Sequence, residues 1–479
     1  RLMLEAMEFA HVPVIVTVRP TWEGGGCDKD DEYRIGLWEA AIEMGVEYID
    51  VELVAWEKNK ILRDRISEAA EKNGTKIILT NHSFEGRPKD LEQRIARLRR
   101  IKQADVLKIA WKAESILDAV DALRLTAKIR AEDGRPAVAI AMGEEGLVSR
   151  LLGKKFGSPF TFAALDRGAE SAPGQPTIEE LREVYRWEEL KADSPVFAVA
   201  GWPIGHSKSP ALHNAGLDAI AGARGIYVPL AIKPGNFAPI LDALRAVPGM
   251  DLRGLSVTIP HKEAAFKYVV DKAGKIDDLS WRIGVLNTIS FESDSAGTTT
   301  VRGFNSDYEG ALDALVSAWA GQRQDVAGKR IAVMGAGGAA RAVVAGLVAS
   351  GASVVVYNRT LQKAQTLADD LGDGKVIAAE WPALRSADAD AFINCTPLGM
   401  FPNVETSPMD DGVQNWSSQT VIFDTVYNPD MTKLLKLAES KGAKIVKGKE
   451  MFIRQAAVQF KAFTGKDAPL EVFRQVMEG

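Results

Sequence analysis

Cysteine is scarce in this sequence of 479 residues: there are two, Cys27 and Cys395, and they lie far apart. Two distant cysteines exclude a disulfide framework and a cysteine-based zinc site, and we expect no metal. No stretch approaches the ~18 consecutive apolar residues of a membrane span, and the first residues show no secretory signal pattern. We therefore expect no membrane association, and a location in the cytoplasm, or in a plastid if a transit peptide was removed.

An excess of positive charge is also missing. The 59 Lys and Arg residues against 64 Asp and Glu residues give a formal net charge of -5, which argues against a nucleic-acid partner. Small anionic ligands would have to be attracted by local Arg and Lys clusters. A hydrophobic content of 46% with 26% charged residues indicates a folded globular protein, and the length predicts two or three domains.

The first part of the chain alternates short apolar runs with amphipathic segments, which is typical of parallel strands joined by helices. This α/β pattern predicts a (β/α)8-type barrel. The runs expected as strands are Val12–Val18, Glu47–Leu53, Lys76–Thr80, Asp105–Ile109, Ala137–Ala141 and Pro159–Ala163. A closed barrel needs eight strands, so we expect the barrel to lack its first two.

A boundary is expected after a charged helix, Ile178–Lys191, at the turn-like break Asp193–Pro195. Strand and helix patterns continue beyond it, with Ser293–Thr300 as a hairpin or loop. We predict a first domain over 1–193, a second over 194–302 with helices 450–479 packing back on it, and a third over 303–449.

Two polar side chains stand at adjacent predicted strand ends. Lys108 interrupts an apolar run, and His82 follows the preceding run. Taken singly, a lysine that reaches the surface and a histidine with structural hydrogen bonds are the ordinary interpretations. Because the carboxyl ends of barrel strands meet at the active-site mouth, the pair predicts chemistry there.

An ordered set of motifs around these residues resembles the type I 3-dehydroquinate dehydratases. The segments are Arg19–Gly25, Ile49–Leu53, His82, Lys108, Gly146–Arg150 and Ser171–Gln175. The resemblance implies that Lys108 forms a Schiff base with the substrate ketone and that His82 acts as general base and then acid. It implies substrate binding by Arg19, Glu23, Arg150, Ser171 and Gln175. Attack requires a neutral lysine, so we expect burial or a nearby cation to lower the pKa of Lys108.

One feature of that family has no counterpart here. The family carries an early Glu-x-Arg pair before the segment that matches Arg19, and this sequence begins after that position. Asp50-Val51-Glu52 matches a later strand and does not replace the pair. We therefore expect part of the substrate clamp to be missing, in line with the strand count.

A glycine-rich turn follows the predicted strand Arg330–Met334. Gly335-x-Gly337-x-x-Ala340 permits a tight turn and brings a pyrophosphate to a helix N-terminus. After the next predicted strand, Asn358-Arg359-Thr360 stands where an NAD-binding unit carries an acidic residue. Arg359 therefore predicts binding of the 2'-phosphate of NADP, with Lys363 as a helper, and a plain surface arginine is the alternative.

The second half resembles shikimate dehydrogenase in motif after motif. The segments are Gly201–Pro210, Ser256–Glu263, Gly284–Thr288, Gly303–Asp307, Asn394–Met400 and Asp424–Pro429. The resemblance implies Lys262 and Asp307 as the catalytic pair, whereas a solvated lysine beside Glu263 is the alternative. It implies substrate binding by Ser207, Ser209, Thr258, Asn287, Tyr427 and Gln455. It implies NADP binding by Gly335, Ala336, Gly337, Gly338, Ala339, Asn358, Arg359, Thr360, Lys363, Thr396 and Gly448.

Together the resemblances imply a barrel followed by a two-domain dehydrogenase, with an α/β substrate domain and a Rossmann NADP domain. The implied reactions are consecutive: 3-dehydroquinate is dehydrated to 3-dehydroshikimate, which NADPH reduces to shikimate. Two alternatives stay open, a C-terminal half that prefers quinate and a non-catalytic regulator that senses the same metabolites. The sequence leaves the oligomeric state undetermined.

Overall fold

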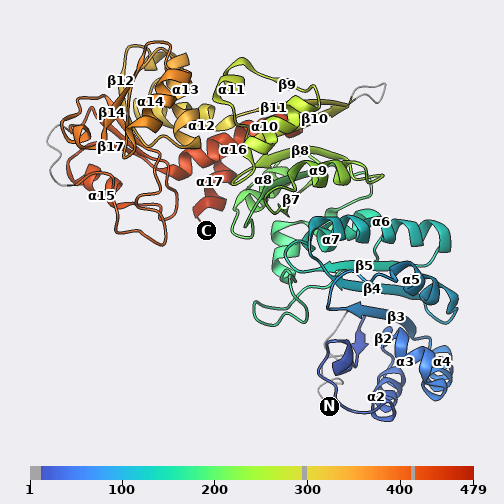
Figure 1. Ribbon diagram of the computed structural model, residues 1–479. Helices are drawn as coiled ribbons and strands as arrows, with labels where there is room; N and C mark the ends of the chain where they lie inside the picture. The colour runs from blue at the N-terminus through green and yellow to red at the C-terminus, as the bar shows by residue number, and fades with distance from the viewer. Residues whose placement is uncertain (1–11, 294–298, 411–415, 479) are drawn as a thin grey trace. The chain divides into compact units, whose positions relative to one another are not determined.

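The computed structural model describes residues 12–293, 299–410 and 416–478 (Figure 1). The chain divides into two compact units near Pro195. The first unit holds the described residues up to Pro195 together with 203–205 and 228–251, and the second unit holds the rest. The described residues form three sheets.

The first sheet is entirely parallel, with the strands in sequence order from β1 to β5. Its strands are β1 (Ile15–Thr17), β2 (Tyr48–Glu52), β3 (Lys76–Ser83), β4 (Val106–Lys112) and β5 (Ala137–Met142). The helices around it are α2 (Asp31–Glu43), α3 (Leu53–Lys58), α4 (Lys60–Asn73), α5 (Leu91–Arg100), α6 (Ile116–Asp133) and α7 (Leu147–Leu152). Every residue of β5 is buried, as expected for a parallel strand covered on both faces. The predicted α/β organisation is confirmed.

Two predictions for secondary structure in this unit were wrong. Pro159–Ala163 forms no strand: Pro159 has no N–H to donate, and the Phe160 carbonyl accepts from the Ser158 hydroxyl at 2.8 Å. Ile178–Lys191 is not one helix, because Arg186 has a φ of 49°, which is incompatible with a right-handed helix. A short π-helix over Glu180–Val184 and a 3-10 helix over Trp187–Glu189 replace it.

The second sheet is mixed, in the order β7-β6-β8-β10-β11-β9. Its strands are β6 (Val196–Gly201), β7 (Ile226–Ala231), β8 (Leu252–Val257), β9 (Lys275–Ile276), β10 (Thr288–Ser293) and β11 (Thr299–Phe304). Its helices are α8 (Ser209–Ala219), α9 (Phe237–Arg245), α10 (Lys262–Asp271), α11 (Asp278–Ile283) and α12 (Ser306–Ala318). Strands β10 and β11 pair antiparallel, and the tip of the predicted hairpin, 294–298, lies outside the described residues.

The third sheet is parallel, in the order β14-β13-β12-β15-β16-β17. Its strands are β12 (Arg330–Met334), β13 (Ser353–Asn358), β14 (Val376–Glu380), β15 (Ala391–Asn394), β16 (Val421–Asp424) and β17 (Lys444–Val446). The helices are α13 (Gly338–Ala349), α14 (Leu361–Leu371), α15 (Lys433–Ser440), α16 (Gly448–Thr464) and α17 (Leu470–Glu478). This is the doubly wound order, in which a nucleotide binds beside the first strand where the order reverses. The predicted strand, glycine turn and helix therefore occur at β12 and α13.

The last two helices pack on elements of the second sheet (Figure 1). Helix α16 crosses α12 closely at Gly310, where a Cβ atom would stand 2.7 Å from the Gln455 nitrogen. Helix α17 packs on α8, and a Cβ atom at Gly216 would stand 2.7 Å from the Phe473 ring. The crossing at Gly310 brings the start of α12 beside the middle of α16, which matters for the second site.

Candidate active sites

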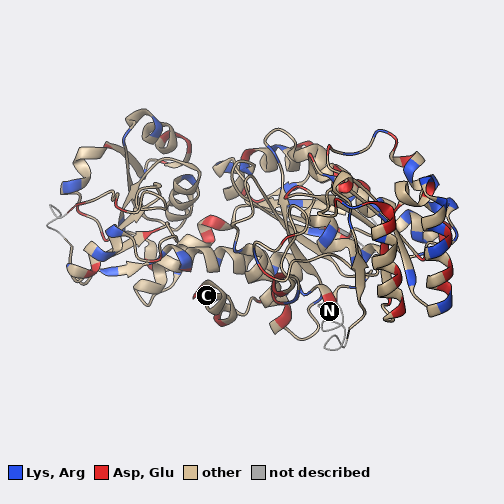
Figure 2. Cartoon of the chain, turned by 90° about the horizontal axis from the view of Figure 1, so that it is seen from below, with Lys and Arg blue, Asp and Glu red and all other residues tan. Residues whose placement is uncertain are grey.

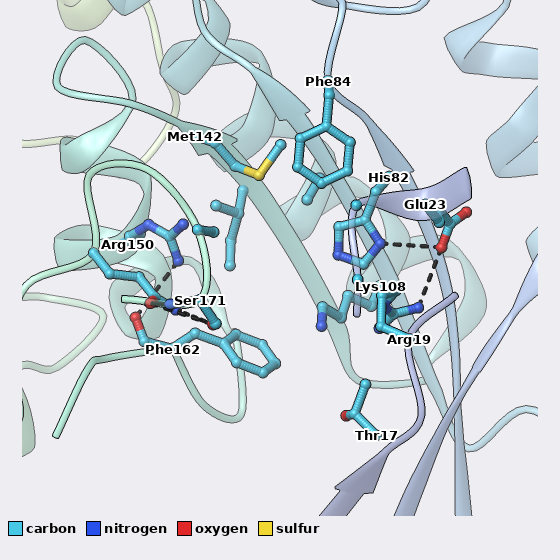
Figure 3. Close-up of a pocket in the computed structure, with 16 residues that line it drawn as sticks. Thr17, Arg19, Glu23, His82, Phe84, Lys108, Met142, Arg150, Phe162 and Ser171 are labelled. Atoms are coloured by element: carbon cyan, nitrogen blue, oxygen red, sulfur yellow. Dashed lines mark hydrogen bonds and ion pairs between the residues drawn. The ribbon is translucent and has the colours of Figure 1, made fainter. Parts of the chain in front are cut away.

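A cavity of about 290 Å³ lies among residues of β1, β3, β4 and β5 and the segments that follow them (Figure 3). All seven side chains predicted for the first site line it: Arg19, Glu23, His82, Lys108, Arg150, Ser171 and Gln175. In Figure 3, Arg150 and Ser171 lie across the cavity from Glu23 and Arg19. The parallel strands account for this gathering, because their carboxyl ends meet at one rim.

Lys108 is 6% exposed, lies within β4 and lines the cavity. Its Nζ atom donates to Asp50 Oδ2 at 2.9 Å and lies 3.9 Å from the centre of the Phe162 ring. Burial lowers the pKa of Lys108, against the attraction of Asp50 and with the repulsion of Arg19. The expected lowering is therefore present, and it favours the neutral amine that a nucleophile requires.

Asp50 is the main residue of this site that the sequence analysis did not assign. Its carboxylate accepts from Lys108 and, at 2.7 Å, from Arg19 Nη2. Burial opposes its ionisation, but Lys108 and Arg19 outweigh that cost and lower the pKa of Asp50 to about 2. The signal was readable, because Asp50 and Glu52 are alternate residues of an otherwise apolar strand and so share one face.

His82 stands beside a second carboxyl group. Its Nδ1 atom lies 3.2 Å from Glu23 Oε2, and Asn81 Nδ2 donates to Glu23 Oε1 at 3.3 Å. Burial, helped by the charges of Arg19 and Lys108, holds the pKa of His82 well below its ordinary value. Burial also raises the pKa of Glu23 to about 7, against the charge of Arg19. A neutral histidine next to a carboxyl group is suited to proton transfer near neutral pH.

Arg150 supplies a cation on the opposite side of the cavity. It is 2% exposed, and burial lowers its pKa to about 10. Its Nε atom has no hydrogen-bond partner among the described residues. Nearby, Ser171 N donates to Gln175 Oε1 at 2.7 Å, and Gln175 Nε2 donates to Ser171 Oγ at 3.1 Å. A buried guanidinium with a free donor is a ready partner for a carboxylate.

The second predicted catalytic pair is also in contact. Lys262 begins α10 and Asp307 lies in the first turn of α12. Lys262 Nζ donates to Asp307 Oδ2 at 2.5 Å, and Asn287 Nδ2 donates to Asp307 Oδ1 at 2.8 Å. Each carboxylate oxygen therefore has its own donor, which fixes the carboxylate beside the lysine.

Asn287 and Gln455 meet through Ser306, a residue that the sequence analysis did not assign. Ser306 N donates to Asn287 Oδ1 at 2.8 Å, and Ser306 Oγ donates to Gln455 Oε1 at 3.2 Å. Gln455 Nε2 donates to the Phe452 carbonyl at 3.1 Å. Gln455 is thus oriented from two directions, and its reach toward Asn287 depends on the crossing of α12 and α16.

Of the remaining predicted substrate-binding residues, Ser209 begins α8 and Ser207, Thr258 and Tyr427 lie outside the helices and strands. Ser209 N donates to Ser207 Oγ at 3.3 Å, and Thr258 N donates to the Ala200 carbonyl at 2.9 Å. Tyr427 is 46% exposed, with its ring centre 5.3 Å from that of Phe452. Within the described ranges, these residues make no hydrogen bond to the Lys262–Asp307 pair.

The nucleotide loop has the shape that a dinucleotide needs. Gly335 has a φ of 106°, and a Cβ atom there would stand 3.1 Å from the Cys395 carbonyl. Gly337 and Gly338 have open space at the start of α13. These two features allow a pyrophosphate to approach the helix N-terminus. Ala336 precedes the two glycines on the loop, and Ala339 follows them in the first turn of α13.

The residues expected at the far end of the nucleotide are also open to solvent. Arg359, Thr360 and Lys363 are exposed at the end of β13 and the start of α14, and Asn358 Nδ2 donates to the Thr360 carbonyl at 2.8 Å. Arg359 stands where an NAD-binding domain carries an acidic residue, so these side chains fit a ribose that carries a phosphate. Thr396 Oγ1 donates to Asn394 Oδ1 at 2.6 Å. A Cβ atom at Gly448 would stand 2.3 Å from the Val426 carbonyl oxygen.

Charge and hydropathy add two observations about the described residues. Lys and Arg are interspersed with Asp and Glu along the helices in Figure 2. Within residues 12–293, 299–410 and 416–478, no group of three or more His, Cys, Asp or Glu side chains is placed to hold a metal ion. In the same ranges, every helix is too short or too polar to cross a bilayer.

Four known families match successive parts of the chain. They are type I 3-dehydroquinase over residues 2–192, the shikimate dehydrogenase substrate binding domain over 199–289, shikimate/quinate 5-dehydrogenase over 319–441, and the shikimate 5'-dehydrogenase C-terminal domain over 448–478. The order of these matches is that of the two sites described above.

Individual proteins agree with these matches. The chloroplastic bifunctional 3-dehydroquinate dehydratase/shikimate dehydrogenase of Arabidopsis thaliana is 36% identical over 97% of this chain and 75% of its own length. The NADP(+) shikimate dehydrogenase of Methanosarcina acetivorans is 39% identical over 59% of this chain and 97% of its own. A solved structure of dehydroquinate dehydratase and shikimate dehydrogenase from S. pombe covers the whole chain and 88% of its own, with 25% identity and a TM-score of 0.50. The chain therefore belongs to the bifunctional 3-dehydroquinate dehydratase/shikimate dehydrogenases, which join a lyase and an NADP-dependent oxidoreductase of the shikimate pathway in one polypeptide.

Proposed function

We propose that Lys108 with His82 carries the dehydration and that Lys262 with Asp307 carries the reduction. The observation that supports this division is that each pair is held in its own site by its own carboxylates. Asp50 lies 2.9 Å from Lys108, and Asp307 lies 2.5 Å from Lys262. The two sets share no residue, so each reaction has a complete acid–base apparatus.

In the dehydration, the Lys108 amine adds to the ketone of 3-dehydroquinate and water leaves to form an iminium. The iminium withdraws electrons from the neighbouring C–H bond, and neutral His82 removes that proton. The electron pair then forms a C=C bond and expels the hydroxyl group of the next carbon, which takes the proton from His82 and leaves as water. Hydrolysis of the iminium frees Lys108 and releases 3-dehydroshikimate.

The clamp for this substrate is cationic. Arg150, with its free Nε donor, binds the substrate carboxylate, since a guanidinium matches that group geometrically. Ser171 and Gln175, which hold one another, face the ring hydroxyls. Arg19 is tied to Asp50 and Glu52, so its main contribution is a positive charge beside Lys108.

In the reduction, Lys262 delivers a proton to the oxygen of the ketone as it becomes an alcohol, and Asp307 keeps the ammonium group in place. When bound, NADPH supplies the hydride. Asn287 and Gln455 bind ring hydroxyls beside this pair, and Ser207 and Ser209 bind the carboxylate. Thr258 and Tyr427 complete the hydroxyl contacts from their loops.

For the cofactor, the N-terminus of α13 holds the pyrophosphate at Gly335, Gly337 and Gly338. Arg359 and Lys363 hold the 2'-phosphate, because their exposed cations stand where an acid would repel it. Thr396 and Gly448 border the nicotinamide end.

Substrate preference, domain limits and location complete the proposal. Ser207 and Ser209 favour shikimate over quinate, which shares its carboxylate and ring hydroxyls. The domain limits are 1–193, 194–302 with 450–479, and 303–449. The location is the cytoplasm or a plastid, and the relative from Arabidopsis thaliana is named chloroplastic.

The test is a coupled assay of NADPH loss, started separately from 3-dehydroquinate and from 3-dehydroshikimate. Both substrates should consume NADPH, and quinate with NADP should react more slowly than shikimate. NADPH loss from 3-dehydroshikimate alone would mean that the first site is silent. Equal rates with quinate and shikimate would overturn the proposed preference.

A further inference from the structure

Gln459 is a buried glutamine one helical turn after Gln455 on α16, and it is 2% exposed. Its Oε1 atom accepts from Ser256 Oγ of β8 at 2.8 Å. Its Nε2 atom donates to the Asn287 carbonyl at 3.2 Å and to Thr288 Oγ1 of β10 at 3.0 Å. Both hydrogens and the oxygen of this amide are therefore used, and none is directed to a ligand.

The direction of these hydrogen bonds can be followed to the reacting pair. Because the Asn287 backbone carbonyl can only accept, the Gln459 amide nitrogen faces this carbonyl and Thr288, and its oxygen faces Ser256. Thr288 Oγ1 accepts that hydrogen and donates its own to Asn287 Oδ1 at 2.7 Å. With its oxygen occupied in this way, Asn287 presents Nδ2 to Asp307.

The opposite orientation of the Asn287 amide would be harmful. It would place Oδ1 against the Asp307 carboxylate, with two acceptors in contact and no hydrogen between them. Two groups fix the orientation of this amide. Ser306 N donates directly to Asn287 Oδ1 at 2.8 Å, and Gln459 acts on the same oxygen through Thr288. Gln459 also donates to the Asn287 backbone carbonyl, which accepts from Val257 N at 2.7 Å as well.

We propose that Gln459 is a positioning residue of the dehydrogenase site, acting through Thr288 to fix which end of the Asn287 amide faces Asp307. The proposal rests on the assignment of Lys262 and Asp307 as the catalytic pair. Gln455 and Gln459 then have distinct tasks on one face of α16. Gln455 lies beside the substrate, whereas Gln459 keeps Asn287 correctly oriented from behind.

The experiment replaces Gln459→Met, which keeps the length of the side chain and removes its hydrogen bonds. The kcat for reduction of 3-dehydroshikimate should fall on the order of tenfold to a hundredfold, because a misplaced group near the reacting atoms is costly. The KM for NADPH should not change. Thr288→Val, which removes the relaying hydroxyl and keeps the shape, should reproduce the fall in kcat.

Two comparisons separate positioning from a general packing defect. Thr464→Val removes a hydroxyl of α16 that bonds only within the helix and its end, and it should leave kcat unchanged. In a double-mutant cycle, Gln459→Met should add little to Asn287→Ala, since both act on one group. Additive losses, an equal loss in Thr464→Val, or a raised KM for NADPH would overturn the proposal.

Lys262→Ala, measured beside these variants, tests the catalytic pair separately from the role of Gln459. If Lys262→Ala keeps full turnover, the assignment of the catalytic pair fails. If Lys262→Ala is inactive while Gln459→Met and Thr288→Val keep the parent kcat, the role of Gln459 alone is overturned. The dehydratase activity of the same samples measures the amount of chain in each assay.

Discussion

Asp50 holds two cations at once, and that arrangement decides the chemistry of the first site. Its carboxylate contacts both Lys108 and Arg19, and its pKa near 2 keeps it ionised at any physiological pH. Without Asp50, the buried cations Lys108 and Arg19 would repel each other and the guanidinium of Arg150. With it, Lys108 stays beside the cavity while burial still lowers the pKa of the amine.

Trapping tests the role of Lys108 directly. Borohydride added with 3-dehydroquinate should leave a covalent adduct on Lys108, seen as a mass increase of one active-site peptide. Lys108→Met should abolish the adduct and lower dehydratase turnover on the order of 10⁴-fold or more, as loss of a covalent nucleophile does. Lys112→Met, which removes an exposed lysine of the same strand, should retain both. An adduct that survives in Lys108→Met would place the Schiff base elsewhere.

The dehydratase rate should depend on pH through Glu23. Above its pKa of about 7, ionised Glu23 accepts the Nδ1 hydrogen of His82 and leaves Nε2 free as a base. Below that pKa, the protonated carboxyl group donates to Nδ1, which moves the histidine hydrogen to Nε2. The kcat/KM should therefore rise as the pH increases through about 7.

Glu23→Gln removes the titration and keeps an acceptor for His82, so its profile should lose that rise. Glu57→Gln, on an exposed carboxylate paired with Arg97, serves as the control and should keep it. A rise near pH 7 that persists in Glu23→Gln would assign the titration to another group.

Cofactor choice is expected to depend on Arg359. Arg359→Asp should lower the preference for NADP over NAD by tenfold to a hundredfold, roughly the contribution of a charge-assisted hydrogen bond to phosphate. Arg385→Asp, on an exposed arginine of the same sheet unit, should leave the ratio of the two kcat/KM values unchanged. An unaltered ratio in Arg359→Asp would show that another residue binds the 2'-phosphate.

At the scale of elements, the crossing of α12 and α16 matters most for the second site. One helix carries Asp307 and the other carries Gln455, and they meet at Gly310 because no side chain separates them. A Cβ atom there would meet backbone atoms, the Gln455 nitrogen at 2.7 Å and the Met451 oxygen at 2.9 Å. Backbone cannot rotate away as a flexible side chain can, so the helices would have to separate.

Gly310→Ala should therefore destabilise the dehydrogenase by about 1–3 kcal/mol and lower its kcat. Thermal melting and the shikimate assay measure the two effects. Gly36→Ala is the matched control, because that glycine lies in helix α2 with open space around it, and it should be neutral or stabilising. A Gly310→Ala variant with unchanged melting would mean that the helices already tolerate more separation.

The element scale also shows why some predictions were wrong. The apolar composition of Pro159–Ala163 suggested a strand. Its proline, however, has no N–H to donate, and the Phe160 carbonyl accepts a hydrogen bond from Ser158 Oγ. The segment instead places Phe162 over Lys108. The glycine turn after β12 was predicted correctly because Gly335 and the following helix are specified by local conformational preferences alone.

For the whole molecule, the two sites should fail independently. Lys108→Met should leave reduction of 3-dehydroshikimate intact, and Lys262→Ala should leave dehydration intact, because the residues assigned to one site include none assigned to the other. Mixing the two variants should restore NADPH consumption from 3-dehydroquinate through free 3-dehydroshikimate. A fall in dehydrogenase kcat in Lys108→Met would reveal a coupling that the separate sets of contacts do not contain.

The sequence by itself determined the order of motifs, the parallel α/β organisation, and the residue types available for Schiff-base, proton-transfer and nucleotide chemistry. These follow from local patterns and from the resemblance of whole motifs. Only the tertiary structure decided the partners: Asp50 with Lys108, 58 residues apart, and Gln459 with Asn287, 172 residues apart. Such pairs depend on strand register and helix crossings, which no local pattern encodes, and they set the burial and charge on which every pKa in these sites depends.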